Sequence, residues 1–257
     1  MYKIVILIYF ALPGIQTAAQ PHAYTVANAH AHNDYENQIP FHMAYGAGFG
    51  SIEADIFLQN DELFVAHDTR ELQQHRTLEK YYLSPLLAEV QNNHGHPFPD
   101  SSRNLQMLID IKTDPVKTLN KLIGILERHP LLINSPGLRW VITGNRPDPS
   151  HFPSYPAFIF FDGELKREYS REVLPRIAMM SADFKNFSQW DGKEEIPELD
   201  EIRLKAAVHQ AHLQHKPVRF WDAPDFKNAW YELMLLEVDF INTDHIDSLS
   251  KFLEVKQ

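Results

Sequence analysis

Glu53 and Asp55 stand two positions apart inside an apolar run, residues 51–58, that has the length and composition of a buried strand. Residues two apart on a strand point to the same side, so the two carboxylates would lie close together. Their repulsion and loss of hydration require a compensating positive charge. Asp110 ends another such run and would add a third oxygen ligand of the kind that Mg²⁺ and Ca²⁺ prefer. We therefore expect one divalent cation, Ca²⁺ or Mg²⁺, held by these three side chains.

A buried salt bridge is the alternative explanation of the same pattern. Lys112 lies two residues after Asp110 and would share its side of the strand. An ammonium group there could neutralise a carboxylate without any metal. We favour the cation over the salt bridge.

Three histidines stand where they could move protons beside such a cation. His30 and His32 lie at the end of the first predicted strand, and His67 ends a short strand after Asp55. Two histidines that flank a metal-bound group can serve as general base and general acid near neutral pH. The chain holds 14 histidines and no cysteine, which excludes disulfides, zinc–thiolate sites, iron–sulfur clusters and cysteine nucleophiles.

The elements that must position these groups alternate along the chain. Eight short apolar runs are predicted to be strands: residues 25–29, 51–58, 105–111, 138–143, 157–161, 176–180, 217–221 and 239–243. The intervening amphipathic stretches predict helices over residues 40–45, 77–91, 115–128, 167–174, 197–214, 225–236 and 246–255. An extra strand over 63–66 would pair back on the second strand. This alternation is typical of the α/β class and predicts a (β/α)8 TIM barrel, in which the carboxyl ends of the strands carry the active site.

Composition narrows the possible partners. The 257 residues are 44% hydrophobic and 23% charged, which is enough apolar material for a large core. The formal net charge of −10 argues against nucleic acid and anionic membranes as partners. We expect one domain over residues 20–257.

The first 19 residues have the layout of a secretory signal peptide. Lys3 precedes an apolar run, residues 4–12, and small residues precede a cleavage site near Ala19. The run is too short to span a bilayer, so we expect no stable membrane insertion and a secreted or periplasmic mature protein. An amino-terminal membrane anchor is the alternative.

Several motifs resemble the glycerophosphodiester phosphodiesterases and the wider phosphatidylinositol-specific phospholipase C-like superfamily. The match covers nearly all of the chain after the leader, and the opening resembles the His-x-His-Asn-Asp-Tyr branch to which the altered-inheritance-of-mitochondria proteins belong. The matching residues are Ala29-His30, Glu36-Asn37, Pro40-Phe41, Ala44, Gly48, Ile52-Glu53-Ala54-Asp55, Val65-Ala66-His67-Asp68, Phe220-Trp221-Asp222, Trp230 and Val238 to Asp244.

The resemblance implies a barrel enzyme that cleaves a small phosphodiester or a phospholipid headgroup. It implies that Glu53, Asp55 and Asp110 hold the cation against the phosphodiester while two histidines act as acid and base. A neighbouring hydroxyl of the substrate would attack phosphorus to give a cyclic phosphate, which water can then open. Lys112 would help to stabilise charge on the phosphoryl oxygens.

Two alignments of the first histidine stay open. The phosphodiesterase pattern aligns His30, whereas the phospholipase pattern aligns His32-Asn33 and would add Asn33 to the metal ligands. Glu36, Arg219 and Trp221 are further candidates for contacts with the substrate or for structural roles.

Two other functions remain alternatives. The paired histidines also resemble those of amidohydrolases and of polymerase-and-histidinol-phosphatase-type hydrolases, which need further histidine ligands near later strand ends; this chain has Asp162, Asp183 and Asp222 there. A non-catalytic barrel that binds a sugar or lipid headgroup is the second alternative.

Overall fold

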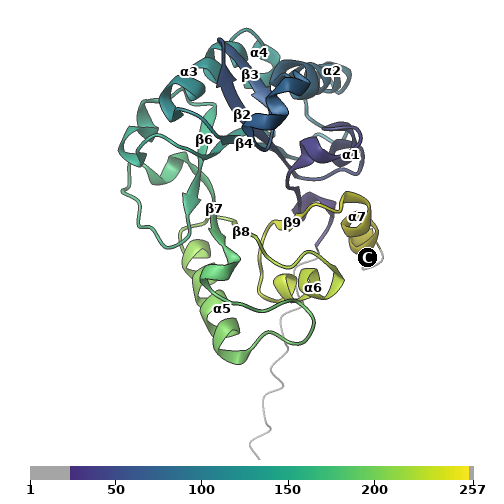
Figure 1. The fold of residues 1–257 in the computed structure, drawn as a ribbon. Helices are drawn as coiled ribbons and strands as arrows, with labels where there is room; N and C mark the ends of the chain where they lie inside the picture. Colours follow the sequence, from purple (N-terminus) through teal and green to yellow (C-terminus); the bar gives the residue numbers. More distant parts are fainter. Residues whose placement is uncertain (1–23, 255–257) are drawn as a thin grey trace, which may run out of the picture.

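The computed structural model describes residues 24–254, and eight parallel strands form a nearly closed barrel with helices around it (Figure 1). The predicted TIM-type fold is confirmed. The strands are β1 Ala29–Ala31, β2 Ser51–Gln59, β3 Glu62–Val65, β4 Leu105–Ile111, β5 Leu138–Gly144, β6 Ile159–Glu164, β7 Ile177–Asp183, β8 Val218–Trp221 and β9 Ile241–Thr243. Their order is β8-β7-β6-β5-β4-β2-β1-β9, with β3 outside this ring. Between β8 and β9 the backbone N–H groups of Asp239 and Phe240 donate to Val218 O, at 3.1 and 3.0 Å.

The hairpin β2–β3 is the one antiparallel pair among the described residues. Ile56 pairs with Val65 and Gln59 pairs with Glu62. The two residues between the strands, Asn60 and Asp61, have φ angles of 49° and 61°, as the tight turns of hairpins require. The extra strand expected from the sequence is therefore present, and it carries the chain to His67.

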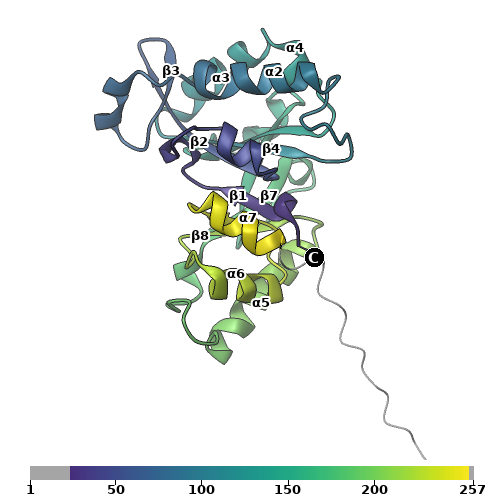
Figure 2. The same ribbon diagram turned by 90° about the vertical axis from the view of Figure 1, so that its right-hand side faces the viewer.

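The helices are α1 His42–Gly46, α2 Ser84–Asn92, α3 Pro115–Leu126, α4 Pro130–Ile133, α5 Glu198–His212, α6 Lys227–Leu235 and α7 Ile246–Glu254. Helices α2, α3 and α4 gather beside β2 and β4, while α5, α6 and α7 lie at the opposite side of the barrel (Figures 1 and 2). Asp114 caps α3 by accepting a hydrogen bond from Lys117 N at 2.8 Å, and Pro115 fits the first helical position.

The predicted helix over residues 167–174 is wrong. The connection from β6 to β7 runs through tight turns instead, in which Glu164 O accepts from Arg167 N at 2.9 Å and Ser170 O accepts from Leu174 N at 2.9 Å. The hydroxyl of Tyr169 also accepts a hydrogen bond from Glu164 N at 2.7 Å. These bonds hold the segment close to the end of β6, and the barrel lacks one of its usual outer helices there.

The first strand starts later than predicted. Residues Val26–Asn28 form a 3-10 turn, because the side chain of Thr25 accepts from Ala27 N at 3.2 Å and the side chain of Asn28 accepts from Thr25 N at 3.1 Å. Strand β1 is therefore only three residues long, and His30 lies in its middle.

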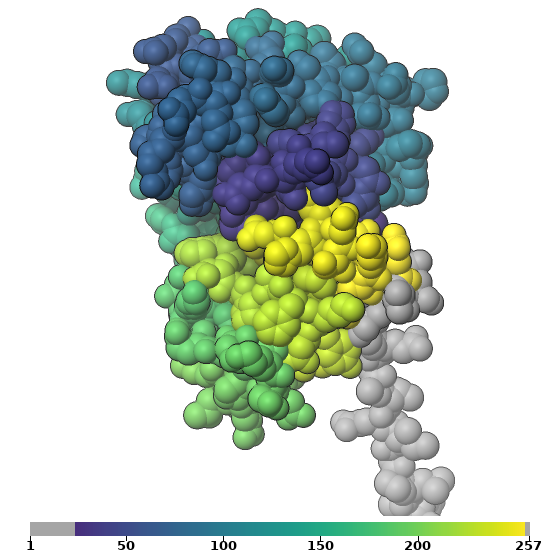
Figure 3. Space-filling view, turned by 45° about the vertical axis from the view of Figure 1, so that its right-hand side comes forward, coloured from purple at the N-terminus to yellow at the C-terminus, as the bar shows by residue number. Residues whose placement is uncertain are grey.

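The hydrophobic core lies between the strands and the helices, and the two ends of the described chain meet. Strand β1 pairs in parallel with β9, and the segment of α7 lies against the first elements of the chain (Figure 3). The expected signal peptide falls outside the described residues. Within residues 24–254, no helix is long and apolar enough to cross a membrane.

Candidate active site

The strand register determines which side chains enter the barrel. Glu53 lies beside Leu108, and Asp55 lies beside Asp110 on the neighbouring strand β4. Because side chains alternate along a strand, Leu108 and Asp110 point to the same side, the apolar one deeper. Leu108 packs in a small apolar cluster with Val141, Ala178 and Phe160. This cluster underlies the polar groups at the carboxyl ends of the strands.

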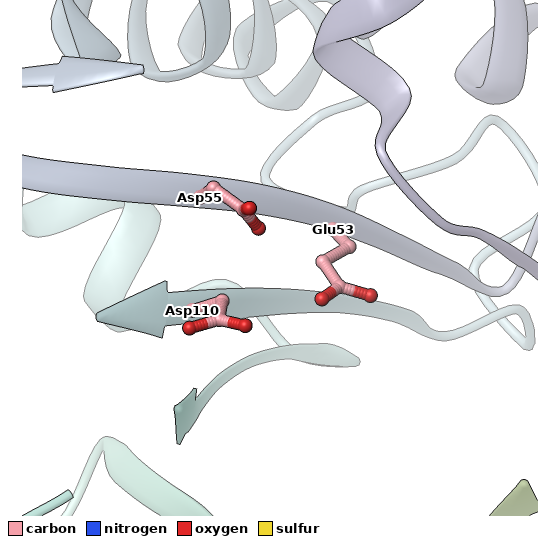
Figure 4. A group of neighbouring side chains, drawn as sticks. All are labelled: Glu53, Asp55 and Asp110. Atoms are coloured by element: carbon pink, nitrogen blue, oxygen red, sulfur yellow. The ribbon is translucent and has the colours of Figure 1, made fainter. Parts of the chain in front are cut away.

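Three carboxylates converge above that floor. Glu53 and Asp55 come from β2 and Asp110 from β4, and each offers an oxygen within 4.8 Å of the others (Figure 4). Glu53 and Asp55 are 3% and 1% exposed. The structure thus brings together the three carboxylates expected from the sequence, here called the carboxylate triad.

Two basic side chains compensate the triad in part. Lys112 Nζ lies 2.9 Å from Asp55 Oδ2 and 2.8 Å from Asp110 Oδ2, and Arg219 Nη1 lies 2.8 Å from Glu53 Oε2. The salt bridge that the sequence allowed is therefore present, yet two cations face three carboxylates. Burial, together with the charges of Glu53 and Asp110, raises the pKa of Asp55 to about 7. Without a further cation, Asp55 therefore holds its proton more tightly than an exposed aspartate does.

The remaining oxygens of the triad fit a hard cation. Asp55 Oδ1 and Asp110 Oδ1 are buried and have no hydrogen-bond partner. Gly144 has a φ of +68°, and a Cβ there would lie 1.8 Å from Asp110 Oδ1. Glycine therefore keeps the space beside this oxygen open. Carboxylate oxygens without donors in such a space match the ligands of Mg²⁺ or Ca²⁺.

His30 is enclosed by the triad's neighbours. It is 0% exposed, its Nδ1 lies 2.7 Å from Ser51 Oγ, and its Nε2 lies 2.7 Å from both Glu53 Oε2 and Arg219 Nη1. Burial, with the nearby charge of Arg219, lowers the pKa of His30 to about 4. Its imidazole is therefore neutral at pH 7 and lies among the side chains that orient Glu53.

His32 occupies a different position, at the mouth of the barrel. Its Nδ1 lies 2.8 Å from Asp244 Oδ1, at the end of β9, and its side chain lines the pocket. Although burial opposes protonation, the hydrogen bond that Nδ1–H donates to Asp244 raises the pKa of His32. Because this bond uses Nδ1, the Nε2 atom of His32 is available to contact a ligand.

His67 lies beside Asp55 of the triad, after the β2–β3 hairpin. Its side chain is 56% exposed, and its Nδ1 lies 3.6 Å from Asp55 Oδ2 and 3.2 Å from the hydroxyl of Tyr35. That buried hydroxyl also lies 2.8 Å from Asp55 Oδ2 and 2.7 Å from Asn33 Oδ1. Asn33 thus contacts Asp55 of the triad through the Tyr35 hydroxyl.

His32, Glu53 and Asp110 line a pocket of about 540 Å³, whereas Asp55 and His67 are not among its lining residues. Lys112, Arg219 and Trp221 line it, whereas Glu36 is exposed on the 3-10 turn Asp34–Glu36 and does not. The far side contains Asp162, which is 1% exposed and whose Oδ2 accepts hydrogen bonds from Thr143 and Ser181.

Sequence reasoning assigned no role to Tyr35, Asp162 or Asp244. Strand-end position marked both aspartates, and Tyr35 belongs to the His-x-His-Asn-Asp-Tyr opening. Their partners, however, come from distant parts of the chain.

Comparisons with known proteins agree with this geometry. Residues 22–130 match the AIM6-like phosphodiesterase domain. Altered inheritance of mitochondria protein 6 of Kluyveromyces lactis is 27% identical over 88% of this chain and 72% of its own length. Its homolog in Arthroderma benhamiae is 26% identical over 85% of this chain and 81% of its own length.

Among solved structures, a glycerophosphodiester phosphodiesterase from Parabacteroides distasonis shares the fold. Its TM-score is 0.57 at 15% sequence identity, with 89% of this chain and 97% of that chain covered. The resemblance predicted from the motifs is thereby confirmed: the chain is similar in sequence to the AIM6-like phosphodiesterases and has the barrel fold of a glycerophosphodiester phosphodiesterase.

Proposed function

We propose that this protein is a metal-dependent phosphodiesterase that cleaves glycerophosphodiester or phosphoinositide-type substrates by histidine acid–base catalysis. The observation that carries the proposal is the carboxylate triad with its unpartnered oxygens: His67 lies beside Asp55, and His32 lines the pocket that Glu53 and Asp110 also line. The phosphodiesterase domain matched by residues 22–130 and the shared fold support the same reaction class.

Glu53, Asp55 and Asp110 would hold one Mg²⁺ or Ca²⁺. When bound, the cation would neutralise charge on the phosphoryl oxygens and reverse the negative local potential of the triad. Lys112 and Arg219 line the same pocket and add positive charge beside the phosphate.

His32 is the proposed general base. In the neutral His32 ring, Nδ1–H donates a hydrogen bond to Asp244. The lone pair of Nε2 is therefore free to take the proton of the attacking hydroxyl. The imidazolium form of His67 is the proposed general acid: its Nε2–H would pass a proton to the leaving alcohol oxygen and leave a neutral ring, while the Tyr35 hydroxyl orients the Nδ1 side. Attack by a neighbouring substrate hydroxyl breaks the bond to the leaving alcohol and yields a cyclic phosphate. Water then opens the ring with the two proton transfers reversed.

The geometry favours His32 over His30 as the first catalytic histidine. His30 is 0% exposed and both of its ring nitrogens have protein partners, so it would act by holding Glu53 in place. The two alternative functions are less well supported. Within residues 24–254 the one group of three potential metal ligands consists of carboxylates alone, whereas amidohydrolase-type sites need histidines. A binding-only barrel would have no use for a held base together with a second histidine.

We further propose that the substrate is a small diester or lipid headgroup met outside the cytoplasm, as the expected signal peptide implies. The net charge of −10 supports the absence of polyanionic partners.

The test is hydrolysis of glycerophosphodiesters and phosphatidylinositol before and after chelation with EDTA, with Mg²⁺ or Ca²⁺ added back. We expect activity to fall at least 100-fold and to return with the cation. Activity that is indifferent to EDTA would contradict the metal assignment.

Replacement of His67 with alanine tests the acid–base scheme in the same assay. We expect a loss of about 100-fold or more, because general acid catalysis typically contributes that much. His75→Ala is the control, since His75 lies in the same segment but packs its ring against Phe64, with the ring centroids 6.0 Å apart, whereas His67 lies beside Asp55. Wild-type turnover in the His67 variant would refute its role.

A further inference from the structure

The loop after β3 carries His67, the proposed general acid, and has to hold it beside the carboxylate triad. Residues 66–76 leave the β2–β3 hairpin and return to it, since Val65 N donates to Arg76 O at 2.7 Å. The His67 side chain is 56% exposed. Packing therefore does little to fix the ring, and its position depends on the hydrogen bonds that this loop makes.

Glu71 holds the backbone of His67. Its Oε2 atom accepts a hydrogen bond from His67 N at 3.0 Å. The same oxygen accepts from Arg76 Nη2, 3.2 Å away at the other end of the loop. One carboxylate oxygen thus joins the residue that carries the proposed acid to the residue at which the loop ends.

Arg76 extends this contact to Tyr35, which precedes it by 41 positions. Its Nη1 donates to Tyr35 O at 2.7 Å, and its guanidinium carbon lies 5.8 Å from the centre of the Tyr35 ring. The hydroxyl of that ring lies 3.2 Å from His67 Nδ1 and 2.8 Å from Asp55 Oδ2. Arg76 is therefore linked to the His67 backbone through Glu71 and to the His67 ring through Tyr35. We call Glu71 and Arg76 the loop clamp.

Burial and charge favour a geometric role for the loop clamp. The side chains of Arg76 and Glu71 are 15% and 31% exposed, and Arg76 Nε is buried without a hydrogen-bond partner. Such an ion pair contributes little net stability, because loss of hydration offsets the attraction between its charges. A guanidinium group, however, is planar and rigid and can hold two acceptors in a fixed relation. Here the two acceptors belong to the two segments that place His67.

We propose that Arg76 and Glu71 are positioning residues, which hold His67 at the distance and angle that proton transfer to the leaving alcohol requires. The inference rests on the proposed function, and both residues act through His67. Misplacement of a catalytic group by about 1 Å can cost about 100-fold in rate. Because a general acid acts only in the transition state, loss of the loop clamp should lower kcat and kcat/KM together and leave KM unchanged.

Steady-state hydrolysis of a glycerophosphodiester by the full chain tests these roles. Arg76→Met keeps the apolar stem without the donors and should lower kcat about 10- to 100-fold. Glu71→Ala should lower it about 10-fold, whereas Glu71→Gln keeps an oxygen that can accept from His67 N and should stay within about 3-fold of the wild type. Arg70→Ala is the matched control and should keep wild-type kcat, since the Arg70 side chain lies in the same loop, is 87% exposed and bonds to Asp68.

A double-mutant cycle separates positioning from a general loss of structure. In a chain that already carries His67→Ala, Arg76→Met should lower kcat by less than about 2-fold more, because the group that it positions is gone. A purely structural effect would multiply with the loss at His67. If Arg76→Met does not fold, Glu71→Ala replaces it in the same cycle. Wild-type kcat in both clamp variants, or their full loss repeated in the His67→Ala background, would overturn the proposal.

The ring ¹⁵N chemical shifts of His67 give a readout that needs no turnover. His67→Ala assigns the signals, and Tyr35→Phe gives the change that follows when the hydroxyl contact is lost. Arg76→Met should move the His67 shifts in the same direction and at least about half as far, whereas Arg70→Ala should leave them in place. Unmoved His67 shifts in Arg76→Met would overturn the loop clamp, whereas a wild-type chain that hydrolyses no phosphodiester would contradict the proposed function.

Discussion

The bond between His32 and Asp244 gives the sharpest test of the proposed catalytic roles. Replacing Asp244 with asparagine keeps the size of the side chain and removes the charge that holds Nδ1 of His32, 2.8 Å away. The amide can also present its NH₂ group to the ring and favour the wrong tautomer. The base would then be present but less often oriented for proton transfer.

The expected loss follows from the exposure of the pair. A hydrogen bond to a charged group contributes about 1.5–3 kcal/mol. The side chains of His32 and Asp244 are 29% and 52% exposed, so we reduce this to about 1–2 kcal/mol for solvent screening. At about 1.4 kcal/mol per factor of ten, kcat/KM should fall about 5- to 30-fold. His32→Ala should cost more, since it removes the base itself.

The assay is steady-state hydrolysis of a glycerophosphodiester at saturating Mg²⁺ or Ca²⁺. His212→Ala is a matched control, because His212 Nε2 lies 2.8 Å from Asp239 Oδ2 in an equivalent pair that does not line the pocket. The control should keep wild-type kcat/KM. Wild-type kcat/KM in the Asp244 variant, or an equal loss in the control, would refute the reasoning.

Two further predictions concern a glycine and a buried carboxylate. Gly144→Ala places a Cβ against Asp110 Oδ1 at a φ of +68°. The affinity for Mg²⁺ or Ca²⁺, measured by calorimetry, should therefore fall at least 10-fold. Gly124→Ala is the control: a Cβ at Gly124 meets nothing within 4 Å, so this variant should keep the wild-type affinity. An unaltered cation affinity in the Gly144 variant would argue against a site at this oxygen. Burial raises the pKa of Asp34 to about 6, so the folded state holds its proton more tightly than the unfolded state, and the free energy of unfolding should fall as pH rises from about 4 to 6. Asp34→Asn should remove about 2 kcal/mol of that decline in urea titrations at pH 4.5 and 7.5, and an identical slope in both proteins would contradict the burial argument.

The sequence predicts the barrel well because each strand can be recognised from the residues within and immediately beside it. Apolar runs such as residues 105–111 are bounded by polar turns. Because both faces of such a strand are buried, the run is apolar throughout, and this distinguishes it from an amphipathic helix. The prediction for residues 167–174 fails because their composition allows a helix, whereas a hydrogen bond from Glu164 N to the Tyr169 hydroxyl holds the segment in turns. A pattern of apolar residues does not reveal such a bond between a side chain and the backbone.

The site divides in the same way. The carboxylate triad is predictable because the period of two along β2 and the position of Asp110 at a strand end need no knowledge of distant contacts. The choice between His30 and His32, in contrast, depends on contacts between distant parts of the chain. The capped turn at Thr25 shortens β1, and the partner of His32 comes from β9. Thr25-x-x-Asn28 is a recognisable capping pattern, whereas the pairing of β1 with β9 follows only from barrel closure.

The pairing of β1 with β9 also has a consequence for when the proposed enzyme can become active. The partner of His32 lies 212 positions further along the chain, whereas the triad is complete once residue 110 has been made. A chain that lacks β9 therefore contains the three cation ligands but has no partner for Nδ1 of His32. On the proposed roles, the base becomes oriented only after the last strand has docked beside the first, so a chain without β9 should turn over more slowly than the folded barrel.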